Sequence, residues 1–174
     1  KVDQWRRKLT PREIGLVDDA IDVLINNAGV LHPGERYGAL EAKALVDAFT
    51  INVVGATLLT QAATPMLERG TAPRVVNISS TLGSIGTRAA FGTPSYAISK
   101  AALNMATRQL AFELSARGIV AVAIHPGWVR TDMGGAEAEL EPATAVASVL
   151  GVIDRLRGAD AGRFLDWNGT EVPW

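Results

Sequence analysis

A chain of 174 residues that is 48% hydrophobic and 20% charged has the composition of a globular domain with enough apolar side chains to form a core. Its formal net charge of −1 gives no electrostatic reason to expect nucleic acid or an anionic membrane surface as a partner. The chain has no cysteine, which excludes disulfides and thiolate metal sites. A reducing, cytoplasmic location without a metal centre is therefore expected.

Strands and helices alternate along the chain. The segment LTPRE predicts a helix start at Thr10 with a helix running to about residue 20, and IDVLINNAG at 21–29 predicts the apolar strand that follows. Further strands are expected at 73–80, 119–127 and 162–169; further helices are expected at about 41–69, through Tyr96 and Lys100 to about 118, and at about 142–156.

The expected strands are apolar nearly throughout, which is typical of parallel strands covered on both faces. Right-handed strand–helix–strand crossovers would build them into a doubly wound α/β sheet, with residues 1–174 as a single domain. The beginning of the chain lacks the apolar core of a signal peptide, and no apolar run approaches the ~20 residues that span a bilayer. No membrane partner is expected.

Three of the expected strands end in small and polar residues. In an open parallel sheet, ligands bind in the crevice at the carboxyl ends of the strands. Small residues there let a flat ligand approach the backbone, although Asn and Gly also form ordinary turns. The residues at these three ends are Asn26, Asn27, Ala28 and Gly29; Asn77, Ser79 and Ser80; and His125, Pro126 and Gly127.

Tyr96 and Lys100 lie four residues apart, which is one helical turn, so both side chains leave the same face of their helix. Such a pair can arise by chance, and the other motifs decide its meaning. NNAG after a strand, Asn52 in the next helix, NISS, YAISK and HPGWVRTDM follow one another in order between about residues 22 and 174. Together they resemble the short-chain dehydrogenases/reductases. The segments SKAALNMAT and GRFLDWNGTEVPW are most similar to the carbonyl-reductase-like and C-factor-like members.

The resemblance implies an NAD(P)-dependent oxidoreductase of Rossmann-like fold that acts on a small carbonyl or alcohol, with NADP favoured over NAD by the subgroup. It implies that Tyr96 donates and accepts the proton, and that Lys100 stabilises the phenolate and binds the nicotinamide ribose. Ser80 would polarise the substrate carbonyl, and Asn52 would anchor a water. The implied cofactor contacts are Asn26, Ala28, Gly29, Tyr96, Lys100, Pro126, Gly127, Val129 and Thr131.

Two spacings depart from the family pattern. The family serine usually lies thirteen residues before the tyrosine, whereas Ser80 lies sixteen before Tyr96, and Ser84 at twelve is a rival. Ser80 is preferred because its place at a strand end fixes the site. The family's glycine-rich turn, TGxxxGxG, occurs nowhere in the chain. The first strands of the fold are therefore expected to be missing, and the 174-residue chain is expected to bind NAD(P)H weakly.

That departure leaves two hypotheses open. The first is a carbonyl reductase or alcohol dehydrogenase seen without its amino-terminal portion. The second is a catalytically inactive relative that acts in oligomerisation or signalling. A homodimer or homotetramer is expected in either case, through helices rich in small residues. These residues are Ala56, Ala62 and Ala63 in one helix and Ala97, Ala101, Ala102 and Ala106 in the other. The alternative for these alanines is packing on the sheet. His125 is expected to be structural.

Overall fold

The computed structural model describes residues 20–174, so the helix expected from Thr10 lies outside the described part. Four parallel strands form one sheet in the order β1-β2-β3-β4. Their bounds are β1 Val23–Asn26, β2 Arg74–Ile78, β3 Val120–His125 and β4 Phe164–Asp166. The helices are α1 Ala42–Phe49, η2 Thr50–Gly55, α2 Ala56–Leu67, η3 Thr81–Gly83, α3 Pro94–Ser115, α4 Pro142–Arg155 and η4 Gly158–Asp160.

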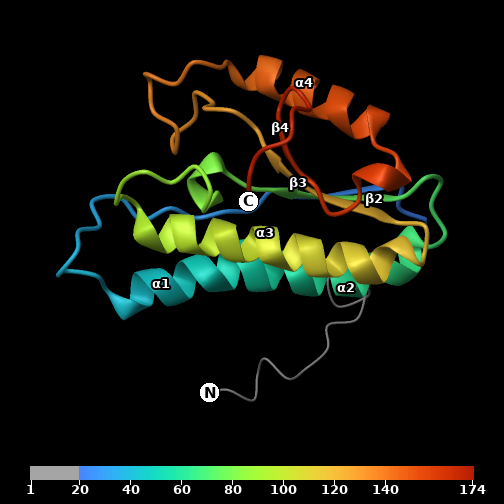
Figure 1. Ribbon diagram of the computed structural model, residues 1–174, viewed down its shortest axis with the longest axis horizontal. Coiled ribbons are helices and arrows are strands. Elements are labelled where there is room, and N and C mark those ends of the chain that lie inside the picture. Colours follow the sequence, from blue (N-terminus) through green and yellow to red (C-terminus); the bar gives the residue numbers. More distant parts are fainter. Residues whose placement is uncertain (1–19) are drawn as a thin grey trace.

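The helices form two layers around this sheet (Figure 1). The run α1–α2 and the long α3 lie side by side on one face, and α4 covers the other. The prediction of a doubly wound parallel sheet is confirmed. The loops that follow β1, β2 and β3 gather at the left end of the molecule in Figure 1, where α3 begins. This end holds the carboxyl ends of the strands.

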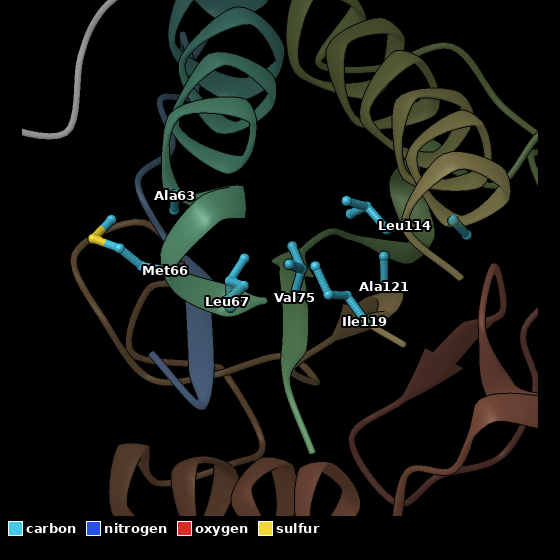
Figure 2. Close-up of a cluster of buried hydrophobic side chains, with 8 residues drawn as sticks. Ala63, Met66, Leu67, Val75, Leu114, Ile119 and Ala121 are labelled. Atoms are coloured by element: carbon cyan, nitrogen blue, oxygen red, sulfur yellow. The ribbon is translucent and has the colours of Figure 1, made fainter. Parts of the chain in front are cut away.

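Neighbouring residues of one strand supply the two halves of the core. Val75 of β2 belongs to the cluster beneath α2 and α3, and Val76 belongs to the cluster beneath α4. Figure 2 shows the first cluster, in which Met66, Leu67 and Leu114 lie over the sheet. Because a strand points successive side chains to opposite faces, an apolar run such as RVVNI is what a sheet covered on both sides requires.

β1 departs from the expectation of strands covered on both faces. Val23 and Ile25 are 37% and 40% exposed. The cluster under α4 contains residues of β2, β3 and β4 but none of β1. One face of β1 therefore has no apolar cover within residues 20–174, although its sequence is as apolar as that of the buried strands.

The helix expected at 41–69 is continuous from Ala42 to Leu67, with a π-helical segment at Thr50–Gly55. By length and composition this run is apolar enough to cross a membrane, so the expectation that no stretch would be was wrong. That expectation considered only unbroken runs of apolar residues. The mean hydropathy of a window can be high even when single Thr and Gln residues interrupt the run. One such helix is weak support for a membrane span. Only 17% of its most apolar window is buried, which leaves an apolar surface exposed.

Candidate active site

The first turns of α3 place Tyr96 and Lys100 against the end of β2. Both side chains are buried, with 8% of Tyr96 and 3% of Lys100 exposed. The Lys100 Nζ donates a hydrogen bond to the carbonyl oxygen of Ile78 (2.6 Å) and lies 5.5 Å from the centroid of the Tyr96 ring. A cation and a phenol are therefore buried close together at the strand end.

Burial controls the ionisation of this pair. It raises the pKa of the Tyr96 phenol, and a hydrogen bond with Ser80 lowers that pKa by a smaller amount. Burial also lowers the pKa of Lys100 to about 8. The family resemblance implied a phenol acidified by Lys100, whereas in this structure desolvation raises the pKa of Tyr96 above its ordinary value.

Ser80 and its rival Ser84 have different surroundings. Ser80 caps η3, accepts a hydrogen bond from the Leu82 backbone nitrogen (3.1 Å) and acts on the Tyr96 phenol. The Ser84 hydroxyl instead donates to the Pro173 carbonyl oxygen (2.6 Å) and accepts from the Thr87 backbone nitrogen (3.2 Å). Ser84 thus holds the carboxyl-terminal segment, and the geometry favours Ser80 as the partner of Tyr96.

The close approach of η3 to α3 depends on Gly83. A Cβ atom at this position would lie 2.6 Å from the backbone carbon of Lys100 and 2.7 Å from the backbone nitrogen of Ala101. Glycine is therefore required for η3 to pack on the backbone of α3, which is what brings Ser80 to Tyr96.

The Asn52 side chain is fully engaged by protein atoms. Its Oδ1 accepts from the Val30 backbone nitrogen (2.8 Å), and its Nδ2 donates to the Val30 carbonyl oxygen (3.0 Å) and to the Ser99 hydroxyl (2.8 Å). Ser99, which the sequence reasoning missed, lies three residues after Tyr96 and one before Lys100, and this spacing was its only signal.

The expected cofactor contacts fall into two groups. Ala28 and Gly29 are exposed beyond the end of β1, and a Cβ at Gly29 would lie 3.6 Å from Lys100 Nζ and 3.5 Å from Asn52 Oδ1. This backbone therefore lies beside the Tyr96–Lys100 pair. The Asn26 side chain is buried instead, and its Nδ2 donates to Asn77 Oδ1 (2.7 Å) and Thr60 Oγ1 (3.0 Å). The amide group of Asn26 therefore links β1 to the neighbouring strand β2 and to the helix α2.

The remaining expected contacts lie in the loop after β3. Gly127 has φ +86°, and a Cβ there would lie 2.3 Å from Leu140 Cδ1, so the turn requires glycine. The loop is closed by hydrogen bonds from the Leu140 nitrogen to the Trp128 carbonyl oxygen (3.0 Å) and from the Arg130 nitrogen to the Leu140 carbonyl oxygen (2.8 Å). Pro126, Val129 and Thr131 belong to this closed segment at the same end of the sheet.

His125 faces a different environment from Tyr96. Its Nδ1 is buried without a hydrogen-bond partner, and burial lowers its pKa while Asp166 raises it by a smaller amount. No hydrogen bond joins His125 to Tyr96, Lys100 or Ser80 in the described part of the chain. Among residues 20–174 there is no cluster of three or more His, Asp or Glu side chains suited to a metal ion.

Similarity to known proteins agrees with this arrangement. Residues 13–141 match the short-chain dehydrogenase family. The chain belongs to that family. The dehydrogenase is 44% identical over 154 residues to the C-signal of Myxococcus xanthus, covering 88% of this chain and 93% of that protein. Family membership makes it an NAD(P)-dependent oxidoreductase, as the resemblance implied.

Two solved carbonyl reductases share the fold closely. The carbonyl reductase Sniffer of D. melanogaster superposes with a TM-score of 0.86 at 34% identity over 90% of the dehydrogenase. The NADPH-bound carbonyl reductase from chicken fatty liver gives 0.85 at 34% identity over 94%. The dehydrogenase covers 68% and 69% of these two chains.

Proposed function

We propose that the dehydrogenase, as a single-domain enzyme of the cytoplasm, interconverts a small aldehyde or ketone and its alcohol, with NADP as the preferred cofactor. The observation that carries this proposal is the meeting of Tyr96, Lys100 and Ser80 beside the Gly29 backbone. The two carbonyl reductases of the same fold support the substrate class, and the NADPH in one of them supports the cofactor.

The residues of the chain fit the nicotinamide end of such a cofactor. The exposed segment at Ala28 and Gly29 carries no side chain larger than a methyl group next to Lys100, whose ammonium would bind ribose hydroxyls. The closed loop from Pro126 to Thr131 would flank the carboxamide. When bound, the cofactor supplies or accepts the hydride.

Proton transfer falls to Tyr96. A phenol is protonated at neutral pH, and burial raises the pKa of Tyr96 further, so Tyr96 can donate a proton to the carbonyl oxygen as the alcohol forms. The Ser80 hydroxyl would hold that oxygen and polarise the carbonyl. Lys100, charged below about pH 8, would stabilise the phenolate left behind. This ionisation suits reduction of a carbonyl at neutral pH.

The hypothesis of an inactive relative is not favoured. A buried lysine with a lowered pKa destabilises the fold, and a surface used only for association or signalling has no need of it. The C-signal of Myxococcus xanthus is a signal by name, and that name describes the relative only.

A spectrophotometric assay tests the proposed activity. The full-length protein, meaning residues 1–174 together with the amino-terminal portion that the family pattern predicts, should oxidise NADPH in the presence of short aldehydes or ketones. We expect a kcat in the ordinary range of about 1–10³ s⁻¹ for at least one of them. NADH should be used less efficiently than NADPH. Micromolar binding of NADPH with no turnover of any carbonyl or alcohol would refute the activity while leaving the fold and family untouched.

Self-association is the second part of the proposal. Ile98, Met105 and Phe112 recur every seven residues along one face of α3 and are 56%, 61% and 67% exposed. Val46 and Phe49 of the neighbouring α1 are also largely exposed. Ala62 and Ala63, by contrast, are buried, and Ala63 packs in the core. The large apolar side chains, more than the alanines, therefore supply a surface that a second copy would cover.

Replacing Phe112 by glutamate should dissociate the dimer or tetramer, because it places a charge within the apolar contact. Light scattering at micromolar concentration should show a fall in mass, and Val146→Glu on α4, at the opposite face of the sheet, should leave the mass unchanged. A wild-type protein that is only monomeric at this concentration would exclude the association.

A further inference from the structure

Glu35 reaches from the loop after β1 to the first turn of α3. Its Oε2 accepts hydrogen bonds from the Ser95 backbone nitrogen (3.2 Å) and from the Ser95 hydroxyl (2.8 Å). The two residues are 60 positions apart in sequence. These bonds tie the loop directly to the residue that precedes Tyr96.

The start of α3 lacks a cap of its own. Helices usually begin at a Ser, Thr, Asp or Asn in extended conformation whose side chain accepts a bond from the first turn. Thr93 stands at this position, but it adopts φ 42° and ψ 53° and its side chain makes no capping bond. Pro94 follows and has no backbone N–H. Ser95 therefore presents the first free amide of the helix, and Glu35 accepts its hydrogen bond.

In the intact chain Glu35, not solvent, accepts the hydrogen bonds of Ser95, because Ser95 is only 1% exposed. Without Glu35, two buried donors of Ser95 would lose their acceptor. The Oε1 of Glu35 is itself buried and has no partner among the described residues. The carboxylate is thus held by its bonds to Ser95 and by the course of its own loop.

That loop is shaped to present Glu35. Gly34 and Gly38, on either side, have φ +78° and +88°, which glycine adopts without strain. Tyr37 contacts Phe91 edge to face, with ring centroids 6.1 Å apart, and Phe91 lies just before α3. The loop therefore meets the entry to the catalytic helix at two points.

We propose that Glu35 is a positioning residue that fixes the first turn of α3 and so aligns Tyr96 with Ser80 and Lys100. The inference rests on the proposed role of Tyr96, but it concerns the placement of that side chain and can be tested without cofactor or substrate. Glu35 itself takes no part in proton transfer.

Two cofactor-free measurements test the placement. In the 174-residue chain Tyr37→Phe leaves Tyr96 as the sole tyrosine, so absorbance at 295 nm reports its ionisation alone. In that background Glu35→Ala should hydrate the pocket and lower the pKa of Tyr96 by roughly half a pH unit or more, toward the ordinary ~10. Hydrogen exchange of amides 96–100 at pH 7 should accelerate about tenfold. Glu35→Gln keeps an acceptor and should restore most of both properties.

Glu41→Ala is the matched control, since Glu41 closes the same loop, is exposed and makes no capping bond. It should change neither measurement. Should Glu35→Ala fail to fold, Ser95→Ala, which removes one of the two bonds, must still accelerate exchange at 96–100. Unchanged exchange and titration in the folded Glu35→Ala chain, or in Ser95→Ala, would overturn the proposal.

The enzyme assay then separates placement from chemistry. In the full-length protein Glu35→Ala should lower kcat by ~10-fold or more, because small misplacements of a reacting group are costly, with the KM for NADPH nearly unchanged. A rise in KM with kcat unchanged would contradict a role in positioning Tyr96. Absence of any reductase activity in the wild type would instead count against the proposed function, while the exchange result still decides the role of Glu35.

Discussion

Tyr96→Phe should lower kcat by ~10²–10⁴-fold while leaving the affinity for NADPH nearly unchanged, because only the proton-transferring hydroxyl is lost. The ring remains buried in the same pocket, so the substitution alters neither the packing of α3 nor the position of Lys100. Steady-state assays of carbonyl reduction measure kcat, and fluorescence titration of NADPH measures binding in the same preparation.

Tyr37→Phe is the control for this experiment. Tyr37 is the other tyrosine of the chain, is 86% exposed and keeps its ring contact with Phe91 as phenylalanine. It should retain wild-type kcat. If Tyr96→Phe kept more than about a tenth of the activity, Tyr96 would not be the acid in this reaction, since general acid catalysis contributes at least ~10²-fold.

Elements with a strong local pattern could be predicted from the sequence. The helix expected at about 142–156 is α4 Pro142–Arg155, and the strand expected at 119–127 contains β3 Val120–His125. Proline at a helix start and an unbroken apolar run are properties of a few neighbouring residues. The exposure of β1 could not be predicted, because it depends on which elements lie over Val23 and Ile25 rather than on the strand itself.

The side chains of the candidate site also divide into those that local sequence predicts and those that it does not. Tyr96 and Lys100 share a helix face, so their proximity follows from spacing alone. Whether Ser80 or Ser84 contacts Tyr96 depends on the turn of η3. The Ser84 hydroxyl instead donates a hydrogen bond to the carbonyl oxygen of Pro173, 89 residues later in the chain. Glu35 gave no signal in the sequence, because a glutamate in a loop acquires its role only from the distant amide that it caps. Raised and lowered pKa values likewise come from burial, which the sequence does not display.

Lys100→Met should make the apo protein more stable at pH 7 and inactive as a reductase. Burial lowers the pKa of Lys100 from 10.5 to about 8, which corresponds to about 3 kcal/mol of destabilisation when the amine is charged in both states. Methionine fills similar space without that charge. The loss of the hydrogen bond to the Ile78 carbonyl offsets roughly 1 kcal/mol of the gain. Urea denaturation measures the difference.

The pH dependence identifies the cause. Between about pH 8 and 10.5 the unfolded lysine binds a proton that the folded one has released, so wild-type stability should rise with pH across this window. Lys100→Met should lack that rise, and the two proteins should approach each other in stability near pH 10.

Carbonyl reduction by the wild type should decline above about pH 8, as Lys100 loses the charge that would stabilise the Tyr96 phenolate. The stability prediction would be refuted by a Lys100→Met variant that is less stable than wild type at pH 7, or by a stability difference that does not change with pH. Either result would mean that burial of the charged Lys100 amine does not destabilise the folded protein.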